Sequence, residues 1–369
     1  MCRHCFMCRH ANPTFLVTKL DSHTPRGYAL GLSRIDEGLA DWTEDLVARL
    51  YQSTMDGLCS ELCEFGWRED LVVQAGREEA VRAGLTPPSA RRAAQRRGLD
   101  GADPVPSGEL PVPTDRLDRV GVEILFVTGL EARERAPMTI GAIAAVLDRL
   151  GCDWTVSSIE RDPGIDLWEL GFSEAAEAAA RRFATDVERL RPVRIVTGSS
   201  RVLRAIREPL PGSLAGAVPP AEHISEFLVA RIDAIVGGGG SIPTRWGAGR
   251  LAYHDPCSLG RRLHVFDAPR ELVRAITGAP PVEFFHSREI AECCGEGGLL
   301  PEVDPELAGR LASAQLDRLP AGVTTVVTAC PGCRAQLGAA AARRGDDVEV
   351  LDITELAAAG LGAPWPPRR

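Results

Sequence analysis

The sequence predicts an α/β protein, because short apolar strands alternate with helices from about residue 120 and because the order strand, helix, helix, strand occurs twice. The first copy is predicted to have strands at 122–127 and 193–197 and helices at 139–150 and 173–190, with Ser173 as an N-cap. The second copy is predicted to have strands at 251–254 and 323–328 and helices at 270–277 and 305–319. Strands joined by helices in this way favour mainly parallel sheets.

Four units follow from these patterns. Residues 1–85 are expected to form an all-α N-terminal unit with a helix at 41–52, and the proline-rich residues 86–117 a linker around one short exposed helix. Residues 118–250 and 251–369 form the two α/β repeats, separated by a flexible connector at Gly237–Gly240. The linker helix carries a basic run that is more typical of a solvated helix face than of a docking site: Arg91, Arg92, Arg96 and Arg97.

Composition and charge exclude several classes of function. The chain has 369 residues, 44% apolar and 25% charged, and its net charge of −9 would repel nucleic acid and anionic membrane surfaces. No apolar stretch reaches the ~18 residues of a spanning helix, and three cysteines in the first eight residues argue against a secretory leader. The only lysine, Lys19, follows no glycine-rich loop, and no G-x-G-x-x-G opens a strand–helix unit. We therefore expect a cytoplasmic protein without a flavin or nicotinamide of its own.

The eleven cysteines are the most informative feature of the sequence. Ten of them lie in two blocks, the first with Cys2, Cys5, Cys8, Cys59 and Cys63, the second with Cys257, Cys293, Cys294, Cys330 and Cys333. Cys152 lies alone among apolar residues and is interpreted as a small buried side chain. In a reducing cytoplasm, clustered cysteines indicate metal binding or redox chemistry rather than structural disulfides.

In the second block, Cys257 and Cys330 each follow a predicted strand. The carboxyl ends of parallel strands open into one crevice, so loops there can bring all five thiols together. Five thiolates are one more than a zinc site of four cysteines uses. The adjacent pair Cys293-Cys294 suits an iron–sulfur cluster better than one tetrahedral ion, and glycines just after it would let backbone amides approach the sulfurs. Structural zinc with a spare cysteine remains the alternative.

Three stretches resemble the CCG-type cysteine-rich domain: HDPCSLGR (254–261), ECCGEGG (292–298) and VVTACPGC (326–333). That family includes the B and D components of heterodisulfide reductase and the iron–sulfur subunits of glycolate oxidase, anaerobic glycerol-3-phosphate dehydrogenase and lactate-utilisation complexes. The resemblance is strong over 251–340 and weaker over 120–250. It implies that a CCG-type cluster, in heterodisulfide reductase a non-cubane [4Fe-4S] cluster, is ligated by Cys257, Cys293, Cys294, Cys330 and Cys333.

The first α/β copy departs from the family pattern. Val127-Thr128-Gly129-Leu130 stands where a cysteine loop would begin, and Val196-Thr197-Gly198-Ser199 replaces the C-x-x-C region. We infer a degenerate CCG-type repeat kept for packing, which leaves one cluster site instead of two. His254 and Asp255 adjoin Cys257, and for them a hydrogen bond to a cluster sulfur and a purely structural role at the strand end are both open.

The first block reads C-x-x-C-x-x-C, with Asn12-Pro13 where a bacterial ferredoxin has Cys-Pro. In two-cluster ferredoxins the fourth cysteine of each run ligates the other cluster. The resemblance therefore implies a ferredoxin-like domain with one cubane [4Fe-4S] cluster on Cys2, Cys5, Cys8 and Cys63, and a vestigial second site at Ser53, Asp56, Cys59 and Asn12. Thr24-Pro25-Arg26-Gly27 also resembles the segment between the two runs. Whether Cys59 replaces Cys63 stays open, as do a zinc site and non-ligating thiols.

These features together favour an electron-transfer subunit with two clusters. By resemblance, its partner is an FAD-dependent dehydrogenase of a 2-hydroxy acid or polyol-type substrate, and electrons pass on to quinone or another acceptor. Such a protein would be cytoplasmic, or peripheral at the inner face of the membrane through its partners. The alternative is a heterodisulfide-reductase-like catalytic subunit that reduces a disulfide at the CCG cluster, although the loss of the first site argues against it. A zinc-bearing scaffold without redox chemistry is the third hypothesis.

Overall fold

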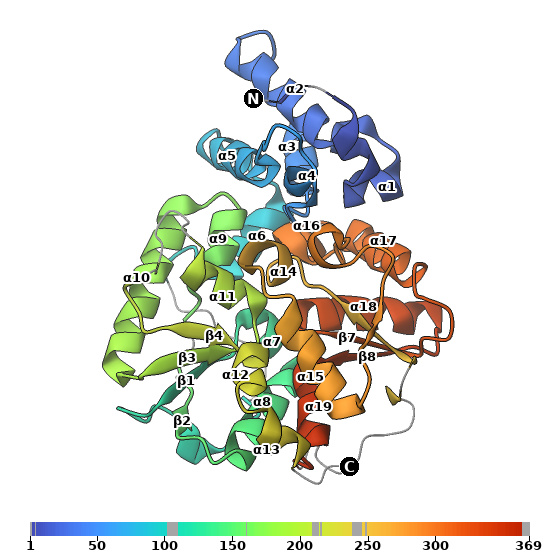
Figure 1. The fold of residues 1–369 in the computed structure, drawn as a ribbon. Coiled ribbons are helices and arrows are strands. Elements are labelled where there is room, and N and C mark those ends of the chain that lie inside the picture. The colour runs from blue at the N-terminus through green and yellow to red at the C-terminus, as the bar shows by residue number, and fades with distance from the viewer. Residues whose placement is uncertain are drawn as a thin grey trace.

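The computed structural model describes residues 2–3, 5–101, 110–159, 161–208, 214, 216–237, 246–247 and 249–363. Figure 1 shows helices of the N-terminal unit above two α/β halves, the first in green and the second in orange and red. Each half contains a four-stranded, all-parallel sheet. The predicted α/β class with mainly parallel sheets is therefore confirmed.

Within the described residues 5–85, every regular element of the N-terminal unit is a helix. They are α1 (Pro13–Thr18), α2 (Pro25–Asp36), α3 (Glu44–Tyr51), α4 (Leu58–Glu61) and α5 (Glu69–Arg82), with the 3-10 turns η1 (Met7–His10) and η2 (Asp21–His23). The helix predicted at 41–52 is confirmed as α3, which begins where the Thr43 side chain accepts a hydrogen bond from the Leu46 amide at 3.2 Å. The buried Tyr51 donates its hydroxyl proton to the Leu170 carbonyl at 2.8 Å, which joins this unit to the first repeat.

The linker helix packs more closely than the sequence predicts. It is α6 (Pro88–Arg96), and the 3-10 turn η3 (Thr114–Arg116) follows after residues 102–109, which lie outside the described part of the chain. The three alanines of α6 are buried, and Arg97 forms ion pairs with Asp166, Glu134 and Glu302 at 3.1–3.3 Å. The other arginines of the run are exposed. The prediction of an exposed helix is thus wrong for one face, because alanines at helical spacing and one paired arginine pack inward.

The first repeat follows the predicted order with additional elements. It contains β1 (Ile124–Val127), α7 (Leu130–Arg135), α8 (Pro137–Arg149), β2 (Trp154–Thr155), α9 (Ile165–Glu169), α10 (Ser173–Leu190), β3 (Arg194–Thr197), α11 (Ser200–Arg207), β4 (Ala221–His223), α12 (Ile224–Val229) and α13 (Ile232–Val236). The strand order is β2-β1-β3-β4. Helix α10 starts at Ser173 itself, after Phe172 as N-cap, and the Ser173 hydroxyl donates to Glu78 at 2.9 Å, so the predicted cap is wrong by one residue. Most of the connector predicted at Gly237–Gly240 lies outside the described residues.

The second repeat has the same plan. It contains β5 (Leu251–His254), α14 (Gly260–Leu263), α15 (Asp267–Thr277), β6 (Val282–Glu283), η5 (Arg288–Ile290), η6 (Gly297–Leu299), α16 (Leu300–Val303), α17 (Pro305–Leu316), β7 (Thr325–Thr328), α18 (Pro331–Arg344), β8 (Glu349–Asp352) and α19 (Ile353–Gly360). Its strand order, β6-β5-β7-β8, is the order of the first sheet shifted by one repeat. The predicted central strands and their helices are confirmed, whereas β6, β8 and the short helices do not follow from the sequence patterns.

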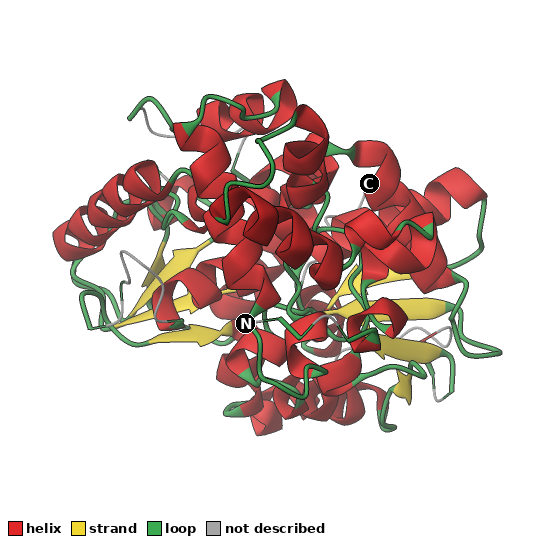
Figure 2. Ribbon diagram, turned by 90° about the horizontal axis from the view of Figure 1, so that it is seen from above, coloured by secondary structure: helices red, strands yellow, loops and turns green. Residues whose placement is uncertain are grey.

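The two repeats pack against each other in matching pairs of helices. Helix α8 packs on α19 and α15 on α12, and α7 packs on α18 as α14 does on α11. Figure 2 shows the two sheets side by side with helices around and between them. One continuous apolar core crosses this junction and includes Ile143 and Leu147 of the first repeat with Leu356 and Ala357 of the second. The two sheets are therefore held as one body, and the N-terminal helices lie over their junction (Figure 1).

Candidate metal centre

The five cysteines of the second block meet at the carboxyl edge of the second sheet. Strand register aligns His254 with Thr328, and Thr328 with Asp352, so the loops leaving β5 and β7 start side by side. Cys257 follows β5 by three residues, and Cys330 is the N-cap of α18, which places Cys333 in the first turn of that helix. The topology thus brings together cysteines that the sequence separates, as the sheet-edge argument predicts.

Contacts between the sulfurs link all five side chains. Cys294 and Cys333 are hydrogen-bonded with 3.1 Å between their sulfurs. Further hydrogen bonds join Cys257 to Cys293, Cys293 to Cys294, and Cys330 to Cys333. Four of the residues are buried, and Cys257 is half-buried. Hydrogen bonds with Cys293 and then Cys333 lower the pKa of Cys294 to about 7. Hydrogen bonding and burial instead raise the pKa of Cys257, Cys293 and Cys333. The set is suited to a soft metal, while ligation itself remains a prediction.

Glycine shapes the loop that carries the central pair. Gly295 has a φ of +91°, and a Cβ there would lie 2.6 Å from the Ala308 carbonyl oxygen, so no larger residue fits. The Gly295 amide donates to the Cys293 sulfur at 3.4 Å. This is the close approach of backbone to sulfur that the sequence predicts, and it turns Cys293 and Cys294 towards the other thiols.

The neighbours of Cys257 have separate roles. The His254 Nε2 atom is buried without a hydrogen-bond partner among the described residues, and a His254 ring nitrogen and the sulfurs of Cys294 and Cys333 lie within 4.8 Å of one another. Burial lowers the pKa of His254 to about 4, so the ring is neutral. A buried nitrogen of this kind fits a group held by the thiols. Asp255, in contrast, is ion-paired with Arg270 at 2.7 Å and accepts the Arg288 amide at 2.8 Å, which is a structural role.

The first block gathers partly. Burial raises the pKa of Cys8, the Arg26 amide at the start of α2 opposes this as a hydrogen-bond donor, and the Cys2 and Cys5 thiols act on Cys8 through their charge. These three cysteines therefore lie together, and Thr24–Gly27 lies beside them, as the resemblance implies. Cys59 is buried, and its thiol donates to the Cys8 carbonyl at 3.9 Å.

Cys63 lies further along the chain beyond the end of α4 and is half-buried. The Arg3 guanidinium lies 5.4 Å from the centre of the Phe65 ring, so the segment with Cys2 and Cys5 passes beside the residues just after Cys63. Of the two candidates for the fourth ligand, Cys59 contacts the Cys8 backbone directly, whereas Cys63 is linked to the N-terminal segment through the neighbouring contact of Phe65 with Arg3. The choice between them remains a prediction in favour of Cys63.

The residues of the expected vestigial site make other bonds. Asn12 accepts the Phe15 amide at 2.8 Å and begins α1. The Ser53 hydroxyl donates to Glu69 at 3.0 Å. Asp56 is ion-paired with Arg261 at 3.0 Å. The sequence did not lead us to predict a role for Arg261. The available signal was its position as the last residue of the HDPCSLGR stretch.

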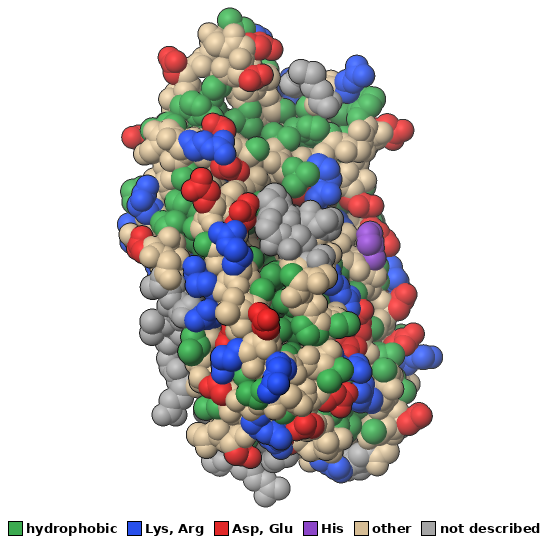
Figure 3. Space-filling model, turned by 90° about the vertical axis from the view of Figure 1, so that its left-hand side faces the viewer, with side chains coloured by type: hydrophobic (Ala, Val, Ile, Leu, Met, Phe, Trp, Pro, Cys, Tyr) green, Lys and Arg blue, Asp and Glu red, His purple; other side chains and the backbone are tan. Residues whose placement is uncertain are grey.

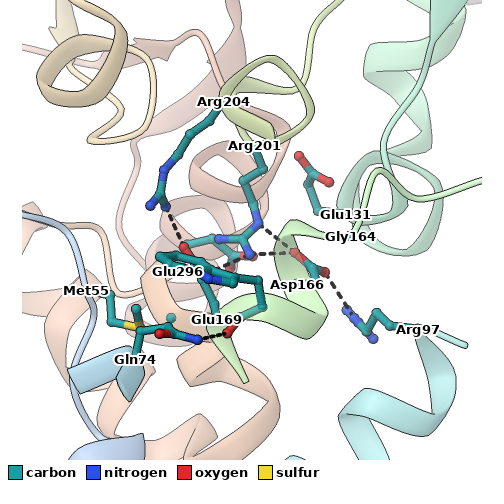
Figure 4. A network of polar contacts seen from close by, with 12 residues as sticks. Met55, Gln74, Arg97, Glu131, Gly164, Asp166, Glu169, Arg201, Arg204 and Glu296 are labelled. Carbon is teal, nitrogen blue, oxygen red and sulfur yellow. Dashed lines mark hydrogen bonds and ion pairs between the residues drawn. The ribbon is translucent and has the colours of Figure 1, made fainter. Parts of the chain in front are cut away.

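In the first repeat, charged side chains occupy the corresponding sheet edge (Figure 4). The Ser199 hydroxyl donates to Glu131, and Arg201 is ion-paired with Asp166 and with Glu169, the latter at 2.9 Å. The network continues from Glu169 to Arg204 at 2.6 Å and from Asp166 to Arg97 at 3.1 Å. Figure 4 shows these side chains converging from α6, α9 and α11. Of the eleven cysteines, only Cys152 belongs to this repeat, and it lies elsewhere, beyond the end of α8.

Comparison with known proteins supports the interpretation of the second repeat. Residues 251–338 match the family model described as a cysteine-rich domain, CCG. Over these residues the chain is therefore similar to a CCG cysteine-rich domain. This domain spans β5 to α18 and so contains all five of the cysteines that the fold brings together.

Relatives extend the similarity beyond this domain. The chain is 26% identical over 341 residues to the D component of dihydromethanophenazine:CoB–CoM heterodisulfide reductase from Methanosarcina barkeri, a match that covers 86% of this chain and 80% of the relative. It is 38% identical over 117 residues to the probable iron-sulfur-binding oxidoreductase FadF of Bacillus subtilis, covering 31% of this chain and 17% of that one. It is 30% identical over 109 residues to lactate utilization protein A of Oceanobacillus iheyensis, covering 29% and 43%.

Two observations concern the surface and the membrane. In the described part of the chain, no helix combines the length and the hydropathy that crossing a bilayer requires. On the face shown in Figure 3, basic and acidic side chains are interspersed. This mixture is consistent with a modest net charge of −9 distributed over many residues of both signs.

Proposed function

We propose that this protein is an iron–sulfur electron-transfer subunit of an oxidoreductase complex. The observation that carries the proposal is the set of five linked sulfurs at one sheet edge, those of Cys257, Cys293, Cys294, Cys330 and Cys333. An iron–sulfur cluster held by these thiols would take up and release single electrons. The unpartnered His254 nitrogen lies beside the set and would donate or accept a hydrogen bond there.

A second, cubane [4Fe-4S] cluster is assigned to Cys2, Cys5, Cys8 and Cys63. Its support is the proximity of the first three thiols and the contact of Arg3 with Phe65 beside the fourth. Cys59 is the competing ligand because it lies against the Cys8 carbonyl. Cys63→Ser is expected to remove this cluster and Cys59→Ser to leave it, as measured by its EPR signal after reduction. The opposite result would assign Cys59.

The electrons would come from an FAD-dependent dehydrogenase that oxidises a 2-hydroxy acid or polyol-type substrate, and would leave to quinone or another acceptor. The relatives include a component of heterodisulfide reductase, which supports function within a complex. They also include a lactate utilization protein, which supports a 2-hydroxy acid as the substrate. We place the protein in the cytoplasm, where partners would bring it to the inner face of the membrane.

Metal analysis of anaerobically purified protein tests the first part. Two [4Fe-4S] clusters predict about eight iron and about eight acid-labile sulfide per chain. Cys294→Ser is expected to lose about half of the iron, because it removes the most central thiol of the five. Cys152→Ser is the matched control, since this half-buried cysteine lies in neither block, and it should keep all of the iron. Zinc in place of iron would overturn the proposal.

Electron transfer tests the second part. In the complex with the flavoprotein, Cys294→Ser is expected to leave flavin reduction by substrate intact and to abolish onward transfer to a water-soluble quinone. Cys152→Ser should support both reactions. Normal onward transfer in Cys294→Ser would contradict the assignment.

A disulfide reductase is the second candidate function, and it is favoured by the similarity to the heterodisulfide reductase component over 86% of the chain. The network of charges in the first repeat weakens it, because that sheet edge offers no second thiol set to hold a cluster for the other sulfur of a disulfide. Oxidation of the reduced, partner-free protein by a low-molecular-weight disulfide would support this candidate. A reduced protein that stays reduced with the disulfide, but is oxidised by quinone, would exclude it.

A further inference from the structure

The segment in which two ferredoxin cysteines are missing lies directly against the loop of the CCG pair. A Cβ added to Gly297 would be 2.2 Å from the Thr54 carbonyl oxygen, and one added to Gly298 would be 2.5 Å from that of Ser53. Helix α4, which follows this segment, packs on η5 just before Cys293. The two backbones therefore touch, and substitutions in one segment act on the other without an intervening layer.

Arg261 joins these two segments. Its Nε atom donates to the Asp56 carbonyl at 3.0 Å and its Nη2 to the Asp56 carboxylate at 3.0 Å. Its Nη1 donates to the carbonyls of Glu289 and Ala291 at 3.0 and 2.6 Å. Arg261 and Asp56 are both buried, with side chains only 3% exposed. A planar guanidinium that makes four bonds has little freedom, so it holds residue 56 at a fixed distance from the chain two residues before Cys293.

The same pair acts on the thiols through charge. Arg261 lies four residues after Cys257 and bonds to the Ala291 carbonyl two residues before Cys293, and the Asp56 carboxylate is ion-paired with it at 3.0 Å, so both charges lie beside the loops that carry these two thiols. A charge buried this close to the sulfurs is poorly screened by solvent.

We propose that Asp56, at the position of a missing ferredoxin cysteine, is a positioning residue for the CCG site: it fixes Arg261, and thereby the loop of Cys293, and it lowers the reduction potential of the group held there. This inference rests on the proposed function, since it takes the five cysteines to hold an iron–sulfur cluster. A negative charge beside a cluster disfavours the addition of an electron, and the Asp56 carboxylate offsets the positive charge of Arg261. A residue of the expected vestigial site would thus adjust the reduction potential of the neighbouring CCG site.

Asp56→Asn tests the charge, because asparagine keeps an oxygen that can accept from Arg261. The midpoint potential of the CCG cluster, followed by EPR in a redox titration, is expected to shift to a more positive value. The unmodified protein, titrated under the same conditions, serves as the reference. Asp70→Asn is the matched control: Asp70 is also a buried carboxylate paired with an arginine of the same helix, Arg262 at 2.7 Å, but it is not among the main charges that act on Cys257 and Cys293.

An unchanged potential in Asp56→Asn, or an equal shift in Asp70→Asn, would overturn the electrostatic part while leaving the proposed function intact. Absence of iron from the unmodified protein would instead overturn the proposed function, and this part of the inference with it.

Hydrogen exchange on the metal-free protein tests the positioning independently of any cluster. Asp56→Ala is expected to increase amide exchange at 288–293, because Arg261 loses its bond to the Asp56 carboxylate and with it a buried counter-charge, whereas Asp56→Glu should restore part of the protection. Equal exchange in Asp56→Ala and the unmodified protein would contradict the positioning role. A general increase over the whole chain would also contradict it, since it would indicate loss of fold rather than release of this loop.

Discussion

The two α/β repeats have the same backbone plan but opposite chemistry at their sheet edges. Gly164 and Gly295 have φ values of +95° and +91°, and a Cβ on either would lie 2.4 or 2.6 Å from a carbonyl oxygen of α10 or α17, respectively. Ser199 and Cys330 are the N-caps of α11 and α18, which follow the equivalent strands β3 and β7. One edge holds linked thiols and the other a network of buried ion pairs. The same backbone plan is therefore compatible with either kind of side chain at this edge.

The comparison also shows how charged side chains can be buried at the sheet edge of the first repeat. Asp162 stands two residues before Gly164, as Cys293 stands two before Gly295, and accepts the Gly164 amide at 2.6 Å. Buried charges are tolerated when each is paired and hydrogen-bonded, which describes Arg201 with Asp166 and Glu169. The first repeat thus retains a polar interior of a different kind, rather than an apolar plug.

The largest effect is expected for Arg201→Ala, which breaks this network. Removing one partner leaves the Asp166 carboxylate without its closest cation in a buried site, and such changes cost about 3–5 kcal/mol. Urea denaturation is expected to show that loss, while the iron content of folded protein stays the same. Loss of iron in step with loss of stability would indicate that the first repeat takes part in the cluster site.

The paired glycines give the next largest effect. Gly164→Ala and Gly295→Ala each add a strained positive φ and a clash, which together cost about 2–4 kcal/mol. Similar destabilisation of both variants by thermal unfolding is expected, but only Gly295→Ala should lower the iron content, because only that loop carries thiols. A difference of more than about 2 kcal/mol between them would show that the two loops are not equivalent.

A pH-dependent effect, smaller per pH unit than the changes above, is expected from Asp162. Burial, and then the charge of Asp166, raises the pKa of Asp162 to about 8. The folded protein therefore binds a proton that the unfolded chain releases near pH 4, and stability falls as pH rises between these values, by at most about 1.4 kcal/mol per pH unit. Asp162→Asn removes this titrating carboxyl group, so the free energy of unfolding of the variant should depend less on pH from 5 to 8. Parallel pH profiles for the variant and the unmodified protein would refute the raised pKa of Asp162.

The smallest effect concerns the helix caps that close each repeat. The Glu226 carboxylate accepts the His223 amide at 2.9 Å in α12, and Glu355 accepts the Asp352 amide at 2.9 Å in α19. Glu226→Ala is expected to cost about 0.5–1 kcal/mol. Both carboxylates also have an arginine partner, Arg207 for Glu226 and Arg334 for Glu355, but the Glu355 side chain is more buried, so Glu355→Ala should cost about 1–2 kcal/mol. Chemical denaturation of the two variants measures the difference, and a reversed order would contradict it.

Periodicity and spacing in the sequence determined the α/β class, the two-fold repetition and the two blocks of cysteines. The central strands and several long helices were predictable because each has a continuous apolar pattern, as at 251–254 and 305–319, whereas α5 and α18, with 14 residues each, were not predicted. The short elements were not, since β2 and β6 have only two residues each. The five thiols could be predicted to converge, because parallel strands end at a common edge.

Only the tertiary structure decided which charges lie beside these thiols. The sequence predicts a solvated Arg97, whereas this side chain is buried against Asp166, and nothing local to Arg261 indicates its bond to Asp56, 205 residues away. Neither contact leaves a local pattern, because an arginine is equally compatible with solvent and with a buried partner until the fold supplies one. Cysteine spacing is a local requirement of chemistry, whereas the pairing of charges is decided by packing between distant segments.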